Sequence, residues 1–151
     1  MKNILANKTN GGFLISKIKQ IQGRVFEKLL AAHGISEFNG AQGRILFVLW
    51  EQDDITISEL SEKTGLAKTT LTAMLDRLEK MGHIQRTSDP ADRRALKIVL
   101  TSEARELKEK YDAVSTEMNE IFYGGFGDEE ILAFENCLDR VLNNLTSHDR
   151  Q

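Results

Sequence analysis

The sequence predicts a mainly α-helical protein with a small β wing, and three observations support this fold class. Apolar side chains recur every three or four residues over most of the 151-residue chain, which is typical of amphipathic helices. Two short segments on either side of residue 90 instead alternate apolar and polar side chains, as half-buried strands do. The chain contains one proline and no long Ser/Gly/Pro tract, so flexible linkers are not expected.

The composition fits one domain over residues 1–151. A chain of this length with 40% hydrophobic residues can bury one substantial core. Its longest apolar runs, such as residues 45–50, fall far short of the roughly 20 residues that a bilayer span requires. Residues 1–10 lack the apolar stretch of a secretion signal, and Cys137 is the only cysteine, which is compatible with a reducing compartment. We therefore expect a cytoplasmic protein without membrane contact.

Two amphipathic helices are expected in the first fifty residues. The first ends near His33 and Gly34, and the second follows Asn39, whose side chain can cap free backbone N–H groups while Gln42 reaches back. The apolar face of the second carries Leu46, Leu49 and Trp50. The apolar stripe of the first is Phe13, Leu14, Ile18, Ile21, Val25, Phe26, Leu29 and Leu30.

Two shorter helices joined by a tight turn come next. Thr56 and Glu59 have the spacing of a capping box for a helix over residues 57–64, which ends at Gly65. The following helix lies within residues 66–82 and is expected to bury Leu71, Met74, Leu75, Leu78 and Met81. At about 100° per residue, mainly short polar side chains point away from that stripe. They are Thr69, Thr72, Ala73, Asp76 and Lys80, with Thr70 and Arg77 on one flank.

A hairpin and two further helices complete the predicted chain. Residues 84–87 and 96–100 are expected to be strands, joined by a basic turn over residues 88–94. Thr101 can cap one long helix that ends at Gly124 and Gly125, and Asp128 opens the last helix. The apolar stripes of these two helices are Leu107, Tyr111, Val114, Met118, Ile121 and Phe122, then Ile131, Phe134, Leu138, Val141 and Leu145.

A helix pair with a glycine turn and a following hairpin is a winged helix-turn-helix, which we place at about residues 55–100. Its second helix can enter a DNA major groove. Residues 63–97 contain eight basic and four acidic side chains, a net +4, although the whole chain carries −3. This local excess of positive charge predicts an anionic partner, double-stranded DNA.

Eight side chains are candidates for DNA contact. Threonine hydroxyls at Thr69, Thr70 and Thr72 can bond bases or phosphates, and their methyl groups can touch thymine methyls. Lys68 and Arg77 would neutralise phosphates, and Arg93 or Arg94 at the hairpin tip would enter an adjacent minor groove. Asp92 could orient Arg94 through an ion pair. The alternative for each group is an ordinary solvated surface.

The stretch from Ser58 to Thr101 resembles the MarR (multiple-antibiotic-resistance regulator) family. The residues that carry the resemblance are 57–65 (ISELSEKTG), 68–72 (KTTLT), 76–82 (DRLEKMG), 89–94 (DPADRR) and Leu100-Thr101. The D-x-R signature at Asp92-Arg93-Arg94 is the most specific part. The flanking helices match the family by pattern more than by residue.

This resemblance implies a homodimer whose flanking helices, about residues 10–34 and 102–147, pack together. It also implies a transcriptional repressor that a small ligand or an oxidant regulates; we expect a small aromatic or amphipathic effector. A two-fold dimer would bind a pseudo-palindromic operator with half-site centres roughly 10 bp apart. Three positions depart from the family pattern: Ala67 stands where a polar cap is usual, His83 where an apolar residue is usual, and Ala104 where glycine is common. A DNA phosphate could occupy the amides that Ala67 leaves uncapped.

Other functions fit the residues less well. No catalytic motif is present, and His33, His83 and His148 are scattered, so we expect no enzyme, no cofactor and no metal; helix-terminus or surface roles are expected for the histidines. The alternative function is a winged-helix protein-interaction module without DNA binding, although such a module has little reason to keep the basic segment.

Three expectations concern the interior and the effector. Cys137 lies in the stripe of the last helix and is expected to be buried and inert. Tyr111 and Met118 are expected in the dimer core. An effector pocket, whose residues the sequence leaves unknown, would lie near Phe47 and Trp50.

Overall fold

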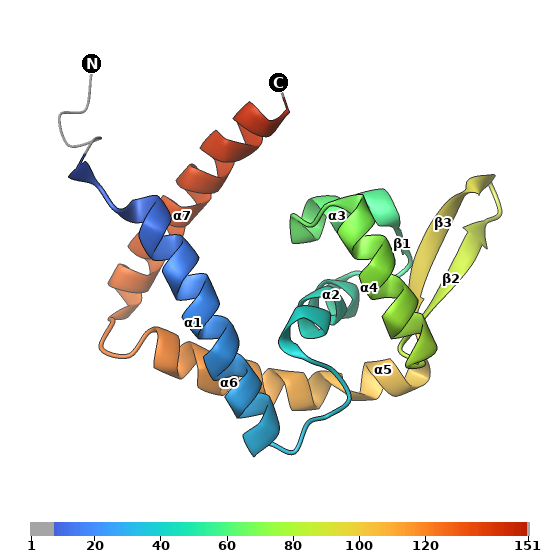
Figure 1. Cartoon of the computed structure of the whole chain (residues 1–151), viewed down its shortest axis with the longest axis horizontal. Helices are drawn as coiled ribbons and strands as arrows, with labels where there is room; N and C mark the ends of the chain where they lie inside the picture. Colours follow the sequence, from blue (N-terminus) through green and yellow to red (C-terminus); the bar gives the residue numbers. More distant parts are fainter. Residues whose placement is uncertain (1–7, 151) are drawn as a thin grey trace. The chain divides into compact units, whose positions relative to one another are not determined.

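The computed structural model describes residues 8–150, except the side chains at positions 89 and 93–95. In chain order, this part forms α1 (Gly11–Ala32), α2 (Gly40–Glu51), β1 (Ile55–Thr56), α3 (Ile57–Thr64), α4 (Lys68–Lys80), β2 (Ile84–Asp89), β3 (Asp92–Leu100), α5 (Ser102–Glu106), α6 (Lys108–Phe122) and α7 (Asp128–Asp149) (Figure 1). The chain divides into a compact unit up to Ser115 and a second one from Thr116 onward. The predicted fold class, mainly α with a small β wing, is confirmed.

Local capping interactions set the ends of α2 and α3, as predicted. The Asn39 Oδ1 atom accepts from the Gln42 backbone N–H at 2.8 Å, and Gln42 Oε1 accepts from the Asn39 N–H at 3.0 Å. Thr56 and Glu59 make the same reciprocal pair, at 3.2 and 3.3 Å. Each box therefore satisfies two backbone donors at the start of its helix.

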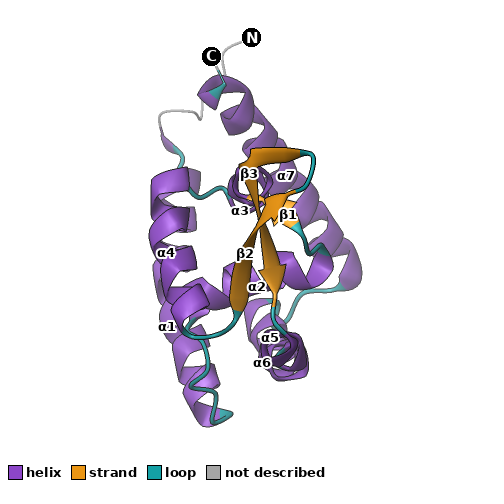
Figure 2. Cartoon of the chain, turned by 90° about the vertical axis from the view of Figure 1, so that its right-hand side faces the viewer, coloured by secondary structure: helices purple, strands orange, loops and turns teal. Residues whose placement is uncertain are grey.

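The three strands form one antiparallel sheet in the order β1-β3-β2 (Figure 2). Ile84 pairs with Leu100, and Ile55 of β1 pairs with Ile98. The strands of the hairpin extend to Asp89 and begin again at Asp92, so the predicted turn over residues 88–94 is too long. Pairing shifts between Ser88 and Asp89, and this irregularity accommodates the additional residues of β3.

Helices α2, α3 and α4 pack their apolar faces into one core with the sheet. Its fully buried members include Ile45, Leu46, Leu49, Ile55, Leu60, Leu71, Leu75, Leu78, Ile84 and Ile98. Met81, which we expected in this core, is 44% exposed. It follows the last residue of α4, where the chain leaves the helix, and its sulfur lies 3.5 Å from the Gln42 amide nitrogen.

The expectation of one long helix after Thr101 is wrong. Thr101 caps α5 by accepting from the Ala104 N–H at 3.2 Å, but α5 ends at Glu106 and α6 starts at Lys108. At the junction, the Leu107 N–H donates to Ala104 O, three residues back, at 3.2 Å. This tighter turn interrupts the α-helical pattern while Leu107 stays buried.

In the second unit, four aromatic rings fix the connection from α6 to α7. Phe122, Tyr123, Phe126 and Phe134 have centroid separations of 4.8–6.3 Å. The Tyr123 hydroxyl donates to Glu135 Oε2 at 2.5 Å, and this hydrogen bond raises the pKa of Tyr123 to about 12. Gly125, at φ +84°, makes the turn between the helices.

Helix α7 has no fully buried residue, although its sequence is amphipathic. Cys137 is exposed, so the expectation that it is buried is wrong. Periodicity identifies an apolar face but does not say whether the same chain covers it. Within residues 8–150, no helix combines the length and the apolar character of a membrane span.

Candidate nucleic-acid interface

The turn between α3 and α4 sets the direction of α4 relative to α3. Gly65 adopts φ +75°, a left-handed conformation that favours glycine, and ends α3. The Ser61 hydroxyl donates to Leu66 O at 2.6 Å, and Thr64 Oγ1 donates to Leu60 O at 2.7 Å while it accepts from the Leu66 N–H at 3.2 Å. The sequence indicated the glycine turn but not these hydroxyl contacts.

Helix α4 has one buried and one exposed face. Leu71, Leu75 and Leu78 are fully buried on one side. The predicted contact residues on α4 are all exposed; together with Asp76 and Glu79 they form what we call the outward face of α4: Lys68, Thr69, Thr70, Thr72, Asp76, Arg77 and Glu79. All five predicted α4 residues are therefore accessible to a partner.

The threonines of this face differ in whether their hydroxyl groups are free to hydrogen-bond to a partner. The Thr72 hydroxyl donates to Lys68 O at 2.8 Å, which leaves its lone pairs and its methyl group for outside contacts. In the described part of the chain, no hydrogen bond uses the hydroxyls of Thr69 or Thr70. Thr70 can therefore both donate to and accept from a base or a phosphate.

The first turn of α4 has no side-chain cap. Ala67 occupies the N-cap position in an extended conformation and has no side-chain hydrogen bond. The backbone N–H groups that begin the helix point along its axis, where the helix dipole favours negative charge. The lack of a side-chain cap at the start of α4 agrees with the expectation from the alanine at position 67.

An ion-pair network that the sequence pattern does not indicate connects α4 to β2. Arg86 Nη2 lies 2.7 Å from Asp76 Oδ1 and 2.8 Å from Glu79 Oε1. The Arg86 backbone N–H also donates to Glu79 Oε2 at 3.2 Å. The hydrogen bonds to Glu79 and then Asp76 raise the pKa of Arg86, and the hydrogen bond from Arg86 lowers the pKa of Glu79. We call these three residues the Arg86 bridge.

The wing is formed by β2, β3 and the turn at Pro90-Ala91 (Figure 1). Asp92 is exposed at the start of β3. The side chains of Arg93 and Arg94 lie outside the described part, so their DNA contacts and the expected ion pair from Asp92 to Arg94 stay predictions.

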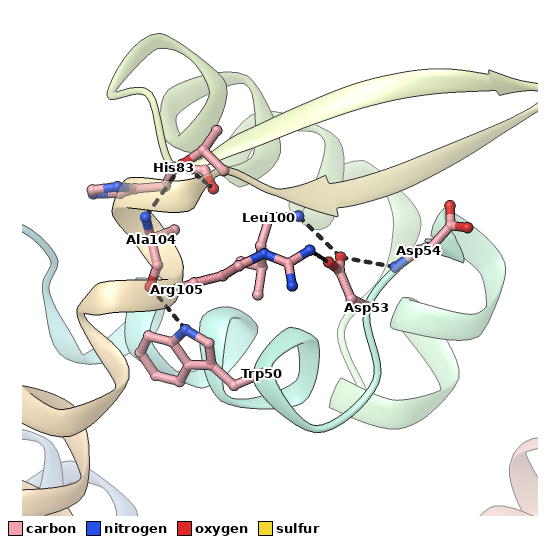
Figure 3. A network of polar contacts seen from close by, with 8 residues as sticks. Trp50, Asp53, Asp54, His83, Leu100, Ala104 and Arg105 are labelled. Carbon is pink, nitrogen blue, oxygen red and sulfur yellow. Dashed lines mark hydrogen bonds and ion pairs between the residues drawn. The ribbon is translucent and has the colours of Figure 1, made fainter.

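A second network fixes the base of the wing against α2 (Figure 3). Asp53 Oδ1 accepts from the Leu100 N–H at 2.9 Å, and Asp53 Oδ2 accepts from Arg105 Nη2 at 2.5 Å. The Trp50 indole N–H donates to Ala104 O at 2.9 Å. The end of β3 and helix α5 are therefore held by Trp50 near the end of α2 and by Asp53 just after it.

His83 is a structural residue at the end of α4 and not a surface residue. Its side chain is 7% exposed, and Nε2 lies 2.6 Å from Glu37 O. Its own N–H donates to Leu78 O at 2.9 Å, which helps to end the helix. Among the described residues, no group of histidine, cysteine, aspartate and glutamate side chains has the arrangement of a metal site.

Five aromatic rings gather where α1, α2 and α6 meet in the first unit. Tyr111 lies 5.1–6.1 Å, centroid to centroid, from Phe26, Phe38, Phe47 and Trp50, and burial raises the pKa of its hydroxyl. Tyr111 therefore packs against rings of its own chain, and its expected place in a dimer core stays a prediction. Met118 is also buried within the single chain.

Comparisons with known proteins identify the family. The family model described as MarR matches residues 38–96. The HTH-type transcriptional regulator PrsX of Escherichia coli is 33% identical over 119 residues, which cover 74% of this chain and 72% of PrsX. The chain belongs to the MarR family of transcriptional regulators.

Solved structures extend the likeness of this MarR-family chain to nearly its full length. AbfR in its reduced form, bound to DNA, is 28% identical with a TM-score of 0.70, and the match covers 93% of each chain. A cysteine-to-serine mutant of MarR from E. coli in complex with operator DNA has a TM-score of 0.80 at 24% identity and covers 93% of this chain and 99% of that one, which shows the shared fold.

Some curated relatives match over a smaller share of their length. HTH-type transcriptional regulator TtmR of Methylorubrum extorquens is 39% identical over 92 residues, which are 61% of this chain but 46% of TtmR. The chain thus spans about half the length of that relative.

Proposed function

We propose that this protein is a sequence-specific DNA-binding regulator that acts as a homodimer and represses transcription until a small ligand releases it. The observation that carries the proposal is the outward face of α4, which presents threonines and cations opposite a fully buried leucine stripe. DNA-bound AbfR, which has the same fold, supports it. In this proposal α4 enters the major groove, and Lys68 and Arg77 contact phosphates.

The wing and the start of α4 supply the remaining DNA contacts in this proposal. Arg93 and Arg94 enter the adjacent minor groove, where Asp92 orients Arg94. The uncapped amides that follow Ala67 bind a phosphate, because free N–H groups and the helix dipole both favour an anion there.

Exposed apolar residues support the homodimer. On α1 they are Phe13, Leu14, Ile15, Ile18 and Ile21, and on α7 they are Leu132, Val141, Leu142 and Leu145. Apolar patches of this kind normally mark a surface that another chain covers. A second copy of the chain would place two α4 helices in successive major grooves, with half-site centres roughly 10 bp apart.

The effector in this proposal is a small aromatic or amphipathic molecule. Phe47 is 41% exposed at the edge of the aromatic cluster that contains Trp50 and Tyr111, so a flat apolar ligand has rings to stack on. Two proteins with this fold interact with molecules that contain an aromatic ring: DNA binding by BpsR of Bordetella bronchiseptica is regulated by 6-hydroxynicotinic acid, and CouR of Rhodococcus jostii binds p-coumaroyl-CoA.

Selection of bound duplexes from a random pool tests the proposal. We expect a pseudo-palindrome to be enriched, and its affinity to fall with salt at a slope of about −0.9 per phosphate contact. Arg94→Ala should weaken binding and make this slope shallower by about one contact, since a cation in the minor groove is lost.

The control for Arg94→Ala is Arg44→Ala. Arg44 is an exposed arginine on α2 that interacts electrostatically with Tyr111, and it is not one of the proposed DNA contacts. Equal affinities of the two variants would remove the wing from the proposal. No enrichment at low salt, with or without aromatic acids, would instead favour a protein-interaction module.

Thr70→Val should relax base preference without disturbing α4. Valine keeps the branched shape of threonine and its helix propensity is similar, but it cannot hydrogen-bond. We expect binding to the selected duplex to weaken by about 1–3 kcal/mol if a base contact is lost, with unchanged binding to an unrelated duplex. Competition binding with both duplexes measures the difference.

Thr72→Val provides the matched control for this experiment. The Thr72 hydroxyl proton is already bonded to Lys68 O, so a smaller loss is expected. If Thr70→Val weakens binding to both duplexes equally, Thr70 contacts the phosphate backbone and not a base.

A further inference from the structure

We propose that Arg86 is a positioning residue for DNA binding: it holds the wing against α4 and partly neutralises two carboxylates that would otherwise repel the phosphate backbone more strongly. This inference rests on the proposed function and deepens it. Arg86 lies on β2, and its two partners, Asp76 and Glu79, lie on α4. The bridge thus joins the two elements that are proposed to contact DNA.

The two carboxylates stand where negative charge opposes binding. Asp76 follows Thr72 by four residues and Thr69 by seven, so all three share one side of the helix. The side chains of Asp76 and Glu79 are 50% and 39% exposed. If uncompensated, they would place two negative charges on a surface that is proposed to approach phosphates.

Arg86 neutralises one of these two charges, and a single guanidinium nitrogen contacts both carboxylates. Nη2 contacts both Asp76 and Glu79, and the arginine side chain is only 24% exposed. Because an arginine in this position keeps its charge at any physiological pH, the compensation is permanent. The remaining exposed cations of α4, Lys68 and Arg77 among them, can then interact with phosphates.

The bridge also fixes the wing relative to α4. Glu79 accepts from the Arg86 guanidinium with one oxygen and from the Arg86 backbone N–H with the other. Strand and helix are therefore joined at both the side chain and the main chain. Partly exposed ion pairs contribute little to the free energy of unfolding, so the main consequence of the bridge lies in the charge and geometry of the surface.

The experiment compares Arg86→Gln with Arg44→Gln in the full-length protein, on the duplex selected for the wild type. We expect Arg86→Gln to weaken binding roughly tenfold at low salt, since two carboxylates lose their counterion, and Arg44→Gln to bind within about threefold of wild type. Circular dichroism and thermal unfolding show whether each variant is folded.

Two further variants separate charge from a merely structural effect. Arg86→Lys keeps the positive charge, and because one arginine nitrogen makes both ion pairs, a single lysine nitrogen can replace it; binding within about threefold of wild type is expected. The triple variant Asp76→Asn/Glu79→Gln/Arg86→Gln removes all three charges and should likewise recover most of the lost affinity. A structural role alone would leave the triple variant at least as weak as Arg86→Gln.

The possible outcomes distinguish this inference from the proposed function. If the wild type enriches a duplex and Arg86→Gln binds it like Arg44→Gln, the inference fails and the proposed function stands. The inference also fails if the triple variant stays as weak as Arg86→Gln. If the wild type binds no duplex, the proposed function fails and the inference fails with it.

Discussion

Replacing Leu142 and Leu145 of α7 by glutamate is expected to produce a monomer that binds the selected duplex at least a hundredfold more weakly. The two side chains are 59% and 64% exposed in the single chain and lie on the apolar side of α7. Covering such a leucine contributes about 1.5–3 kcal/mol, and an unpaired carboxylate in the same place is strongly unfavourable. A monomer contacts only one half-site, so it loses the linked binding of the second.

The measurement is sedimentation equilibrium together with DNA affinity. Asn143→Glu/Asn144→Glu adds the same charges to neighbouring exposed positions of α7 that point away from Leu142 and Leu145, and it should leave the dimer intact. A dimer that persists with glutamate at 142 and 145 would show that this face of α7 is not the interface.

Leu75→Ala is expected to lower the free energy of unfolding by about 2–5 kcal/mol, because it leaves a cavity beneath the outward face of α4. Leu75 is fully buried in the core that joins α4 to the other helices and the sheet. Domains of this size have a total stability of about 5–15 kcal/mol, so the loss is a large fraction of it.

Urea denaturation at several protein concentrations measures this effect, since dimer formation adds to apparent stability. The matched control is Thr69→Ala on the exposed side of the same helix, for which a change within about 0.5 kcal/mol is expected. A loss below about 1 kcal/mol for Leu75→Ala would mean that neighbouring side chains fill the cavity.

The features that the sequence predicted well are those that depend on nearby residues. The capping boxes at Asn39 and Thr56 involve partners three residues away, and the outward position of Thr70 follows from helical periodicity alone. Helix ends at Gly65 and near Gly82 follow from the left-handed conformation that glycine adopts readily.

The contacts that the sequence did not predict join residues that meet only after folding. Arg86 reaches Glu79 and Asp76 because the chain reverses at Gly82, and Asp53 binds Arg105 across 52 residues. Nothing in the pattern of charges selects these pairs from the many acidic and basic residues of the chain. Strand β1 has two residues, too few for an alternating pattern to be visible.

The exposure of Cys137 could not be predicted, because an amphipathic stripe has the same appearance whether or not its own chain covers it. The rings around Tyr111 could not be predicted either, because its place in a helical stripe does not show that Phe26 and Trp50 of the same chain pack against it.

Trp50 is part of the aromatic cluster and also of the network that holds the base of the wing. Its ring packs against Phe38 and Tyr111, while its N–H is bonded to Ala104 in α5, close to the end of β3. A rearrangement of the rings that rotates the indole must lengthen or break this bond, at a cost of about 0.5–1.5 kcal/mol. A rotation of the indole therefore changes both the packing of the rings and the attachment of the wing. The fluorescence emission of Trp50, the single tryptophan of the chain, reports on both.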